Sequence, residues 1–221
     1  MSNILTIGLV SEGTTDQRFL PNIIKRTFEE LSFDCKGEID VYDIEIIEKK
    51  GIGFVNHVLN ASKDYSWINI LCVHSDSDNE SDKNVLINKI NPTLEKVKNL
   101  DENENCKNIV FVVPIQMTES WMLSDTNLLI EEIGTTKTIE DLDLPININS
   151  IEQISNPKQK IIECISTALL EQSSRRRNSI KISDLYLPIS QKISLDKLKN
   201  LSSYNKFRNN CIKSLKKLDY L

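Results

Sequence analysis

The sequence contains few of the residues that mark disulfide-rich or zinc-binding proteins. Its 5 cysteines are odd in number, none of them forms a C-x-x-C pair, and only His57 and His74 could join them as metal ligands. This pattern suggests neither a disulfide framework nor a zinc site. We therefore expect the cysteines to be reduced thiols, most of them buried.

Glycine and proline are also scarce, with 6 of each among 221 residues, which argues against long disordered linkers. No apolar run approaches the roughly 18 residues needed to cross a bilayer. The N-terminus has no basic start and reaches Glu12 too early for a signal peptide. We therefore expect a cytoplasmic protein that has no membrane as a partner.

Positive charge exceeds negative charge only near one end of the chain. The formal net charge is −5, yet twelve Lys and Arg stand against three Asp between Ser173 and Leu221. Such a segment can hold a polyanion such as DNA or RNA, or it can dock on its own acidic body. Guanidinium forks match phosphate oxygens, although a solvated helix end is the alternative. The candidate phosphate-binding residues are Arg175, Arg176, Arg177 and Lys181.

The apolar residues of the first half alternate between two periods. β-Rich apolar runs predict strands at 4–10, 39–47, 67–73 and 109–113. Helical spacing predicts helices at 16–31, 54–62 and 85–100, the first preceded by a capping box from Thr14 to Gln17. Alternating strands and helices are typical of a parallel sheet with helices on both faces. The sequence therefore predicts an α/β, Rossmann-like domain over residues 1–125.

The rest of the chain has a different pattern. It predicts helices at 121–133, 157–172 and 194–218, with irregular or extended segments at 142–151 and 181–190. Trp121 is interpreted as a packing residue. We expect residues 126–221 to form a mainly helical lobe with a basic C-terminal segment.

Acidic residues follow the predicted strands where each strand ends. Glu12 follows the first strand, Asp76 and Asp78 follow the third, and Glu119 lies shortly after the fourth. The ligand crevice of an open parallel sheet lies beyond the carboxyl ends of its strands. Two aspartates at i and i+2 of an extended segment project from the same side. These acids are therefore candidate metal ligands and catalytic residues, with a solvated acidic loop as the alternative for "SDSDNESDK".

Crowded carboxylates need a cation among them or a bound proton. Oxygen ligands favour Mg²⁺ or Mn²⁺ over softer metals. Gly13 leaves space beside Glu12 for a phosphate. His74 could bind phosphate or assist proton transfer, or it could be a hydrogen-bonded structural group. For Glu119 the alternative is a surface or capping carboxylate.

Three motifs carry a resemblance to a known family. "GLVSEGTTDQRFL" resembles the first motif of TOPRIM domains, and "ILCVHSDSDN" resembles their strand-end D-x-D. Together with "VPIQMTESWMLSD", these stretches are similar to a prokaryotic TOPRIM-like family of unknown function, related to OLD-family nucleases and often encoded beside ATPases in anti-phage loci. The likeness covers residues 4–125 and does not extend to the C-terminal lobe.

The resemblance implies roles for particular residues. Glu12 corresponds to the motif glutamate, and Asp76 and Asp78 correspond to the D-x-D pair that binds Mg²⁺. Gly13 and Asp16 match the family's turn and helix start, although Asp16 could equally be a first-turn acid favoured by the helix dipole.

The activity that the resemblance implies is Mg²⁺-dependent phosphodiester hydrolysis of DNA or RNA. The protein would be a nuclease that acts with an ATPase partner in anti-phage defence, and it could form a homo-oligomer. The alternative is a catalytically inert regulatory or scaffold subunit that binds metal, nucleotide or a partner ATPase. A phospho-accepting receiver domain is disfavoured, because it would show an acidic pair after its first strand, where this chain has Glu12 alone.

Overall fold

The computed structural model describes residues 3–79, 81–177 and 179–221 and divides into two compact units. The first unit comprises Met1–Ser75, Asp82–Val113 and Lys206–Leu221, and the second comprises Asp76–Ser81 and Pro114–Asn205. This division differs from the expected boundary between residues 125 and 126. The chain enters the second unit directly after the last strand of the sheet, and the segment from Lys206 returns to supply a helix to the first unit.

The first unit is built on a parallel sheet. Its strands are β2 (Ile7–Val10), β4 (Glu45–Ile46), β5 (Ile70–His74) and β6 (Ile109–Val112), in the spatial order β4-β2-β5-β6. The chain runs from β2 outward to β4 and then crosses back to β5, so the strand order switches between β2 and β5. A ligand crevice is expected beyond the carboxyl ends of these two strands. The predicted α/β class with a parallel sheet is confirmed.

Two of the predicted strands are interrupted. β1 (Asn3–Leu5) pairs in parallel with β3 (Ile39–Val41), separately from the sheet that contains β2 and β4. The break before β2 lies at Thr6, whose N–H and hydroxyl both donate to Oδ1 of Asn69 at 2.8 Å. The N–H of Thr6 is therefore bonded to a side chain, while its carbonyl still accepts the backbone N–H groups of Asn69 and Ile70. The strands expected over 4–10 and 39–47 are each divided.

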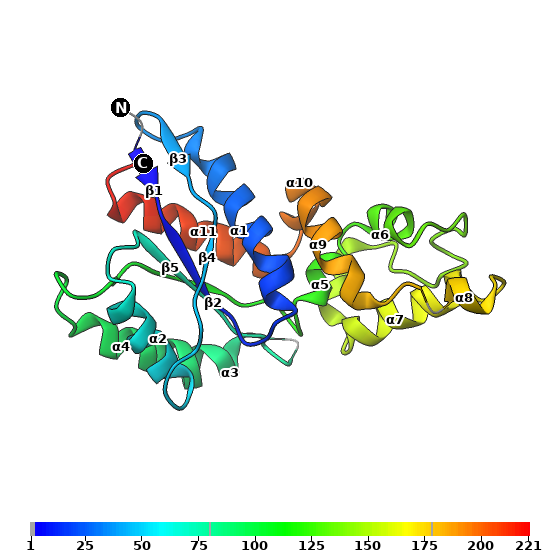
Figure 1. The fold of residues 1–221 in the computed structure, drawn as a ribbon, viewed down its shortest axis with the longest axis horizontal. Helices are drawn as coiled ribbons and strands as arrows, with labels where there is room; N and C mark the ends of the chain where they lie inside the picture. The colour runs from blue at the N-terminus through cyan, green and yellow to red at the C-terminus, as the bar shows by residue number, and fades with distance from the viewer. Residues whose placement is uncertain (1–2, 80, 178) are drawn as a thin grey trace. The chain divides into compact units, whose positions relative to one another are not determined.

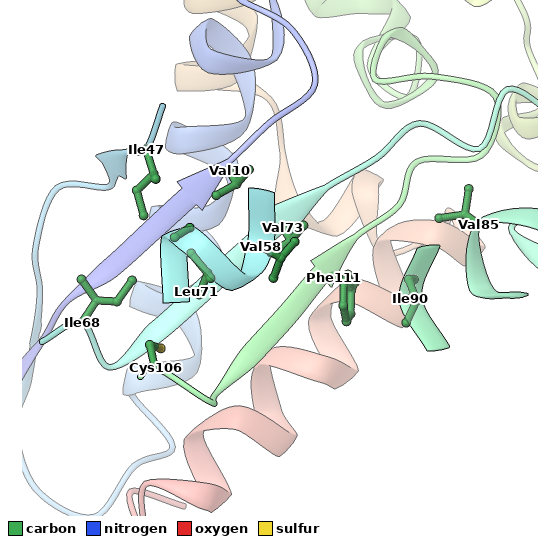
Figure 2. Packing of buried hydrophobic residues seen from close by; sticks show 11 residues of the cluster. Val10, Ile47, Val58, Ile68, Leu71, Val73, Val85, Ile90, Cys106 and Phe111 are labelled. Carbon is green, nitrogen blue, oxygen red and sulfur yellow. The ribbon is translucent and has the colours of Figure 1, made fainter. Parts of the chain in front are cut away.

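Helices cover both faces of this sheet (Figure 1). On one face lie α1 (Asp16–Ser32) and the part of α11 (Ser202–Lys217) that belongs to the first unit; on the other lie α2 (Phe54–Asp64), α3 (Lys83–Val85), η1 (Leu86–Ile90) and α4 (Asn91–Lys98). The core on the α2 side joins Leu71 and Val73 of β5 to Phe111, Val58 and Ile90 (Figure 2). This burial holds the strand ends in a fixed frame.

The helical run after β5 contains a wider π-helical segment, η1. Pro92 follows it and has no N–H to donate to the carbonyl of Asn88, which favours a local change of helical register. The hydroxyl of Thr93 donates to the carbonyl of Lys89 at 2.6 Å. The predicted helix over 85–100 is thus present but locally widened around Lys89.

The second unit is mainly helical, as expected for the C-terminal lobe. Its helices are α5 (Glu119–Met122), α6 (Thr126–Ile133), the 3₁₀ helix η2 (Ile148–Gln153), α7 (Pro157–Ala168), α8 (Ser174–Arg177), α9 (Ile182–Lys192) and α10 (Leu195–Leu198). Trp121 is fully buried, donates from Nε1 to Ser203 Oγ at 2.8 Å and packs edge-on against Tyr204 at 5.4 Å between ring centroids. Its predicted packing role is confirmed.

The expectation of an extended segment over 181–190 is wrong, because α9 occupies these residues. Leu185, Tyr186 and Ile189 have helical spacing and are buried on one side of α9. This burial outweighs the hydrogen bond that Pro188 cannot make inside the helix.

The helix expected over 121–133 is also divided, into α5 and α6. Asp125 caps α6 by accepting the N–H of Leu128 at 3.1 Å.

The cysteines are free thiols, with Cys35 partly exposed and the others buried, as predicted. Burial raises the pKa of the Cys72 and Cys211 thiols, which keeps them protonated at neutral pH. In the described part of the chain, no helix is long and apolar enough to span a bilayer.

Candidate metal centre

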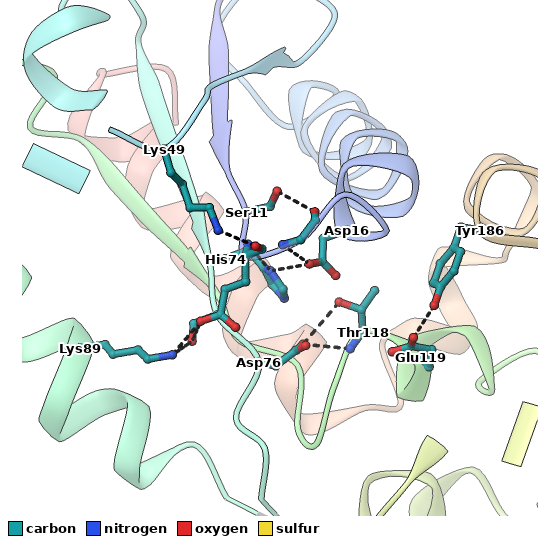
Figure 3. A network of polar contacts seen from close by, with 12 residues as sticks. Ser11, Asp16, Lys49, His74, Asp76, Lys89, Thr118, Glu119 and Tyr186 are labelled. Atoms are coloured by element: carbon teal, nitrogen blue, oxygen red, sulfur yellow. Dashed lines mark hydrogen bonds and ion pairs between the residues drawn. The ribbon is translucent and has the colours of Figure 1, made fainter. Parts of the chain in front are cut away.

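Glu12 lies beyond the carboxyl end of β2, as the sequence predicted, and is joined there to the end of β5. Its Oε1 accepts a hydrogen bond from Ser75 Oγ at 2.8 Å and another from Lys89 Nζ at 2.7 Å (Figure 3). Lys89 Nζ also donates to Ser75 Oγ at 2.7 Å. Glu12, Ser75 and Lys89 thus form one polar cluster at the point where the strand order switches.

The environment of Glu12 favours its ionised form. Burial of the carboxyl group opposes ionisation, but the hydrogen bonds from Lys89 and Ser75 and the charge of Lys89 together outweigh it and lower its pKa. Glu12 is therefore a carboxylate at neutral pH, already neutralised by an ammonium group.

Asp16 and His74 form a second, more deeply buried pair. Asp16 lies in the first turn of α1, and its Oδ2 accepts the N–H of Gly13 at 2.9 Å. His74 ends β5, with Nδ1 at 3.6 Å from Asp16 Oδ2 and at 3.5 Å from the N–H donor of Glu12. A Cβ at Gly13 would lie 3.2 Å from Asp16 Oδ2 and would crowd this oxygen.

The predicted capping box is not formed. The N-cap of α1 is Thr15, which makes no side-chain capping bond. Asp16 holds the turn through Gly13, so the expectation of a first-turn acid is confirmed, with an added contact to a buried imidazole.

Asp76 extends this pair along the chain, because it is the second residue after His74. One ligand atom each from Asp16, His74 and Asp76 lies within 4.8 Å of the others, so this group could hold a metal ion. The donor set fits a divalent cation: carboxylate oxygens suit Mg²⁺ and Mn²⁺, and an imidazole nitrogen suits Mn²⁺ or Zn²⁺ better than Mg²⁺. Asp76 Oδ1 accepts the N–H of Thr118 at 3.0 Å, an outer contact that fixes its carboxylate.

Asp78 is placed differently from the expectation. The backbone is not extended at this residue, where φ is +49°, and the side chain is exposed. Ser77 Oγ donates to the carbonyl of Asn79 at 2.6 Å and closes a turn around Asp78. Asp76 and Asp78 therefore do not share the extended segment that the sequence predicted, and Asp78 is outside the ligand group found among the described residues.

Glu119 is buried at the start of α5, so the alternative of a surface carboxylate is wrong. It accepts a hydrogen bond from the hydroxyl of Tyr186 and lies 3.9 Å from Lys158 Nζ. Burial raises its pKa, and the Tyr186 hydrogen bond opposes that shift. A metal-binding role for Glu119 stays a prediction, and its hydrogen-bond donor Tyr186 is itself buried.

The arginine triplet forms the short helix α8 and is exposed. Arg176 donates to the carbonyl of Ile133 at 3.4 Å, and Arg177 donates to that of Leu170 at 3.2 Å. The phosphate-binding role of Arg175, Arg176, Arg177 and the exposed Lys181 stays a prediction.

The later part of the basic segment docks on its own acidic body. Lys206 Nζ lies 2.7 Å from Asp82 Oδ2, and Arg208 Nη2 lies 3.0 Å from Glu30 Oε1. Both contacts lie within the first unit. They match the alternative that the basic segment docks on the chain's own acidic residues.

A cavity of about 300 Å³ opens in the first unit beside the Glu12 cluster. Its lining includes Glu12, Lys49, Phe54, His57, His74 and Lys89. The sequence interpretation missed both lysines. Lys49 follows the second predicted strand and could have been found by the strand-end rule that identified Glu12, whereas nothing in the sequence marked Lys89.

No protein-family model, curated protein or solved structure matches this chain, so the resemblance to TOPRIM domains stays a prediction.

Proposed function

We propose that this protein hydrolyses phosphodiester bonds of DNA or RNA with Mg²⁺ or Mn²⁺ bound by Asp16, His74 and Asp76. The observation that carries the proposal is the potential metal-binding group at the switch point of a parallel sheet, beside the Glu12 carboxylate. A metal there would polarise a phosphoryl oxygen and lower the pKa of a bound water.

The protein's own groups have distinct tasks in this proposal. Asp16 and Asp76 hold the cation, each with one oxygen fixed by a backbone N–H. His74 supplies a nitrogen ligand from the rigid end of β5. Glu12, ionised at neutral pH, is poised to accept a proton from an attacking water.

The partners belong to the same proposal. The resemblance of the three sequence motifs extends it to an ATPase partner and a role in anti-phage defence. The exposed arginines of α8 supply cationic groups for a polyanionic substrate.

A nuclease assay tests the proposal. Plasmid, linear DNA and RNA are incubated with Mg²⁺ or Mn²⁺, with and without the neighbouring ATPase. We expect Asp76→Asn and Glu12→Gln each to lower cleavage by at least about 100-fold. Glu95→Gln, an exposed acid on α4, is the matched control and should leave cleavage unchanged. Equal cleavage by the wild type and both site variants would overturn the assignment.

One observation favours a second candidate function, a metal- or nucleotide-binding regulatory subunit. The ammonium of Lys89 neutralises Glu12, so this acid needs no metal to be stable. Mn²⁺ binding that Asp76→Asn abolishes, with no cleavage of any substrate, would support this candidate over the nuclease.

A further inference from the structure

The cavity beside Glu12 has the position and size of a small-ligand site. It lies at the carboxyl ends of β2 and β5, where open α/β sheets bind their ligands. Its volume of about 300 Å³ suits a ligand of a few tens of atoms. All of its lining residues belong to the first unit, so the cavity is formed within one compact unit.

The charges that line the cavity favour an anion. Lys49 and Lys89 bring two ammonium groups, against the single carboxylate of Glu12. Glu12 is paired with Lys89, which leaves the charge of Lys49 in excess.

Lys49 donates at 2.5 Å to the main-chain carbonyl of Glu12. Among the residues that the structure describes, no carboxylate forms an ion pair with it. An anion in the cavity would be attracted by this uncompensated charge.

The start of α2 adds to this preference. Its N-cap is Gly53, which has no side chain to accept the first helical N–H groups, and a Cβ there would meet open space. The preceding turn is held by side chains of α2: Asn60 Nδ2 donates to the carbonyl of Lys50, and His57 Nε2 lies 3.0 Å from the carbonyl of Gly51. An uncapped helix start near the cavity favours negative charge.

Apolar side chains, those of Val10, Phe54 and Val58, also line the cavity. The ring of Phe54 lies under Lys89 Nζ, at 5.5 Å from the ring centroid, so one face of the ring is covered by a cation.

From these observations we infer that the cavity binds a phosphate monoester, either at the end of a nucleic acid strand or on a free nucleotide. An ionised monoester carries between one and two negative charges and matches the excess charge at Lys49. The part of the inference that concerns reaction rests on the proposed function: His74 lines the cavity and belongs to the potential metal-binding group, so a terminal phosphate in the cavity would bring the adjacent diester to the acids. The substrate class would then be strands with phosphorylated ends.

Calorimetric titration of the full chain in the presence of EDTA tests the binding. The probes are one short DNA oligonucleotide with a 5′-phosphate, with a 3′-phosphate or with hydroxyl ends, and adenosine 5′-monophosphate. We expect one phosphorylated form to bind at least about tenfold more tightly than the hydroxyl form, and Lys49→Gln to remove that preference. Lys50→Gln is the matched control, because the adjacent Lys50 pairs with Asp64 at 2.8 Å, and it should keep the preference.

The arms of the experiment separate the two sources of phosphate. The monophosphate binding as tightly as the phosphorylated oligonucleotide identifies a free nucleotide, and weaker binding identifies a strand end. Equal affinity for phosphorylated and hydroxyl ends, or a preference that Lys49→Gln retains, overturns the inference.

The outcome is independent of cleavage. A Lys49-dependent phosphate preference without cleavage of any substrate leaves the inference standing and removes the nuclease. Cleavage that does not depend on phosphorylated ends, together with equal binding of phosphorylated and hydroxyl ends, would support the nuclease and overturn the inference.

Discussion

At the scale of single residues, two glutamates predicted for the same task have opposite environments. Burial is the largest influence on both carboxyl groups and favours their protonated forms. Lys89 and Ser75 reverse this influence at Glu12, whereas the hydrogen bond from Tyr186 does not reverse it at Glu119. The pKa of Glu12 is thus lowered, which keeps it a carboxylate, whereas that of Glu119 is raised.

Replacing Lys89 by Met should raise the pKa of Glu12, because burial then outweighs the remaining hydrogen bond from Ser75. In the wild type, the lowered pKa stabilises the fold above the ordinary value of 4.5, and this contribution is lost as pH falls through the folded-state pKa. The variant should lose less stability on acidification. With 36% of the Glu12 side chain exposed, we expect a difference of no more than about 1 kcal/mol.

Carbon-detected NMR titration of the Glu12 carboxyl group and urea unfolding between pH 3 and 7 measure these effects. Lys96→Met, on the exposed surface of α4, is the control. An unchanged Glu12 pKa in Lys89→Met would show that Lys89 does not set the ionisation of this acid.

The sequence located part of this site and missed part. The strand-end rule placed Glu12, His74 and Asp76 correctly at the sheet edge, because parallel strands bring their carboxyl ends together. Lys89 could not be found in this way, because it is 77 residues from Glu12 and reaches it only through the packing of η1. The placement of Asp78 failed because local turn chemistry, not strand period, sets its backbone.

At the scale of elements, the sequence predicted the sheet of the first half of the chain better than the helices of the second half. Alternating apolar runs revealed the sheet, because each buried strand contributes a nearly continuous apolar segment. The helix α9 was not predicted, although Leu185, Tyr186 and Ile189 have helical spacing. Their burial decides the structure, despite Pro188 inside the helix. The break at Thr6 could not be predicted from the local sequence either, because it involves a hydrogen bond to a side chain 63 residues away.

Asn69→Ala should destabilise the first unit by about 1–2 kcal/mol, because the partly buried N–H of Thr6 loses its acceptor. Asn69→Asp keeps an acceptor oxygen and should cost less. Urea unfolding of both variants measures the difference. Equal losses, or no loss in Asn69→Ala, would contradict the role assigned to this bond.

At the scale of the whole molecule, the chain leaves the first unit after Val113 and rejoins it at Lys206. The returning segment supplies buried residues such as Cys211 and Leu215. The predicted boundary at residue 125 overlooked this return, because a basic helical segment has the same sequence pattern whether it covers a sheet or belongs to a separate lobe.

Leu215→Ala should therefore weaken the parallel sheet although it lies far along the chain. We expect a loss of about 2–5 kcal/mol from the cavity it creates, whereas the exposed Lys216→Ala should change stability by less than about 0.5 kcal/mol. Hydrogen exchange followed by mass spectrometry should show faster exchange in β5. Unchanged exchange in β5 would mean that the returning segment does not support the sheet.

The return of the chain at Lys206 also sets an order of events during synthesis. The strands β2, β4, β5 and β6 leave the ribosome first, but one face of their sheet lacks the cover of α11 until residues beyond Asn205 have been translated. The intervening helices of the second unit can pack before that point. One face of the nascent sheet would then stay partly exposed to solvent while the helices of the second unit fold.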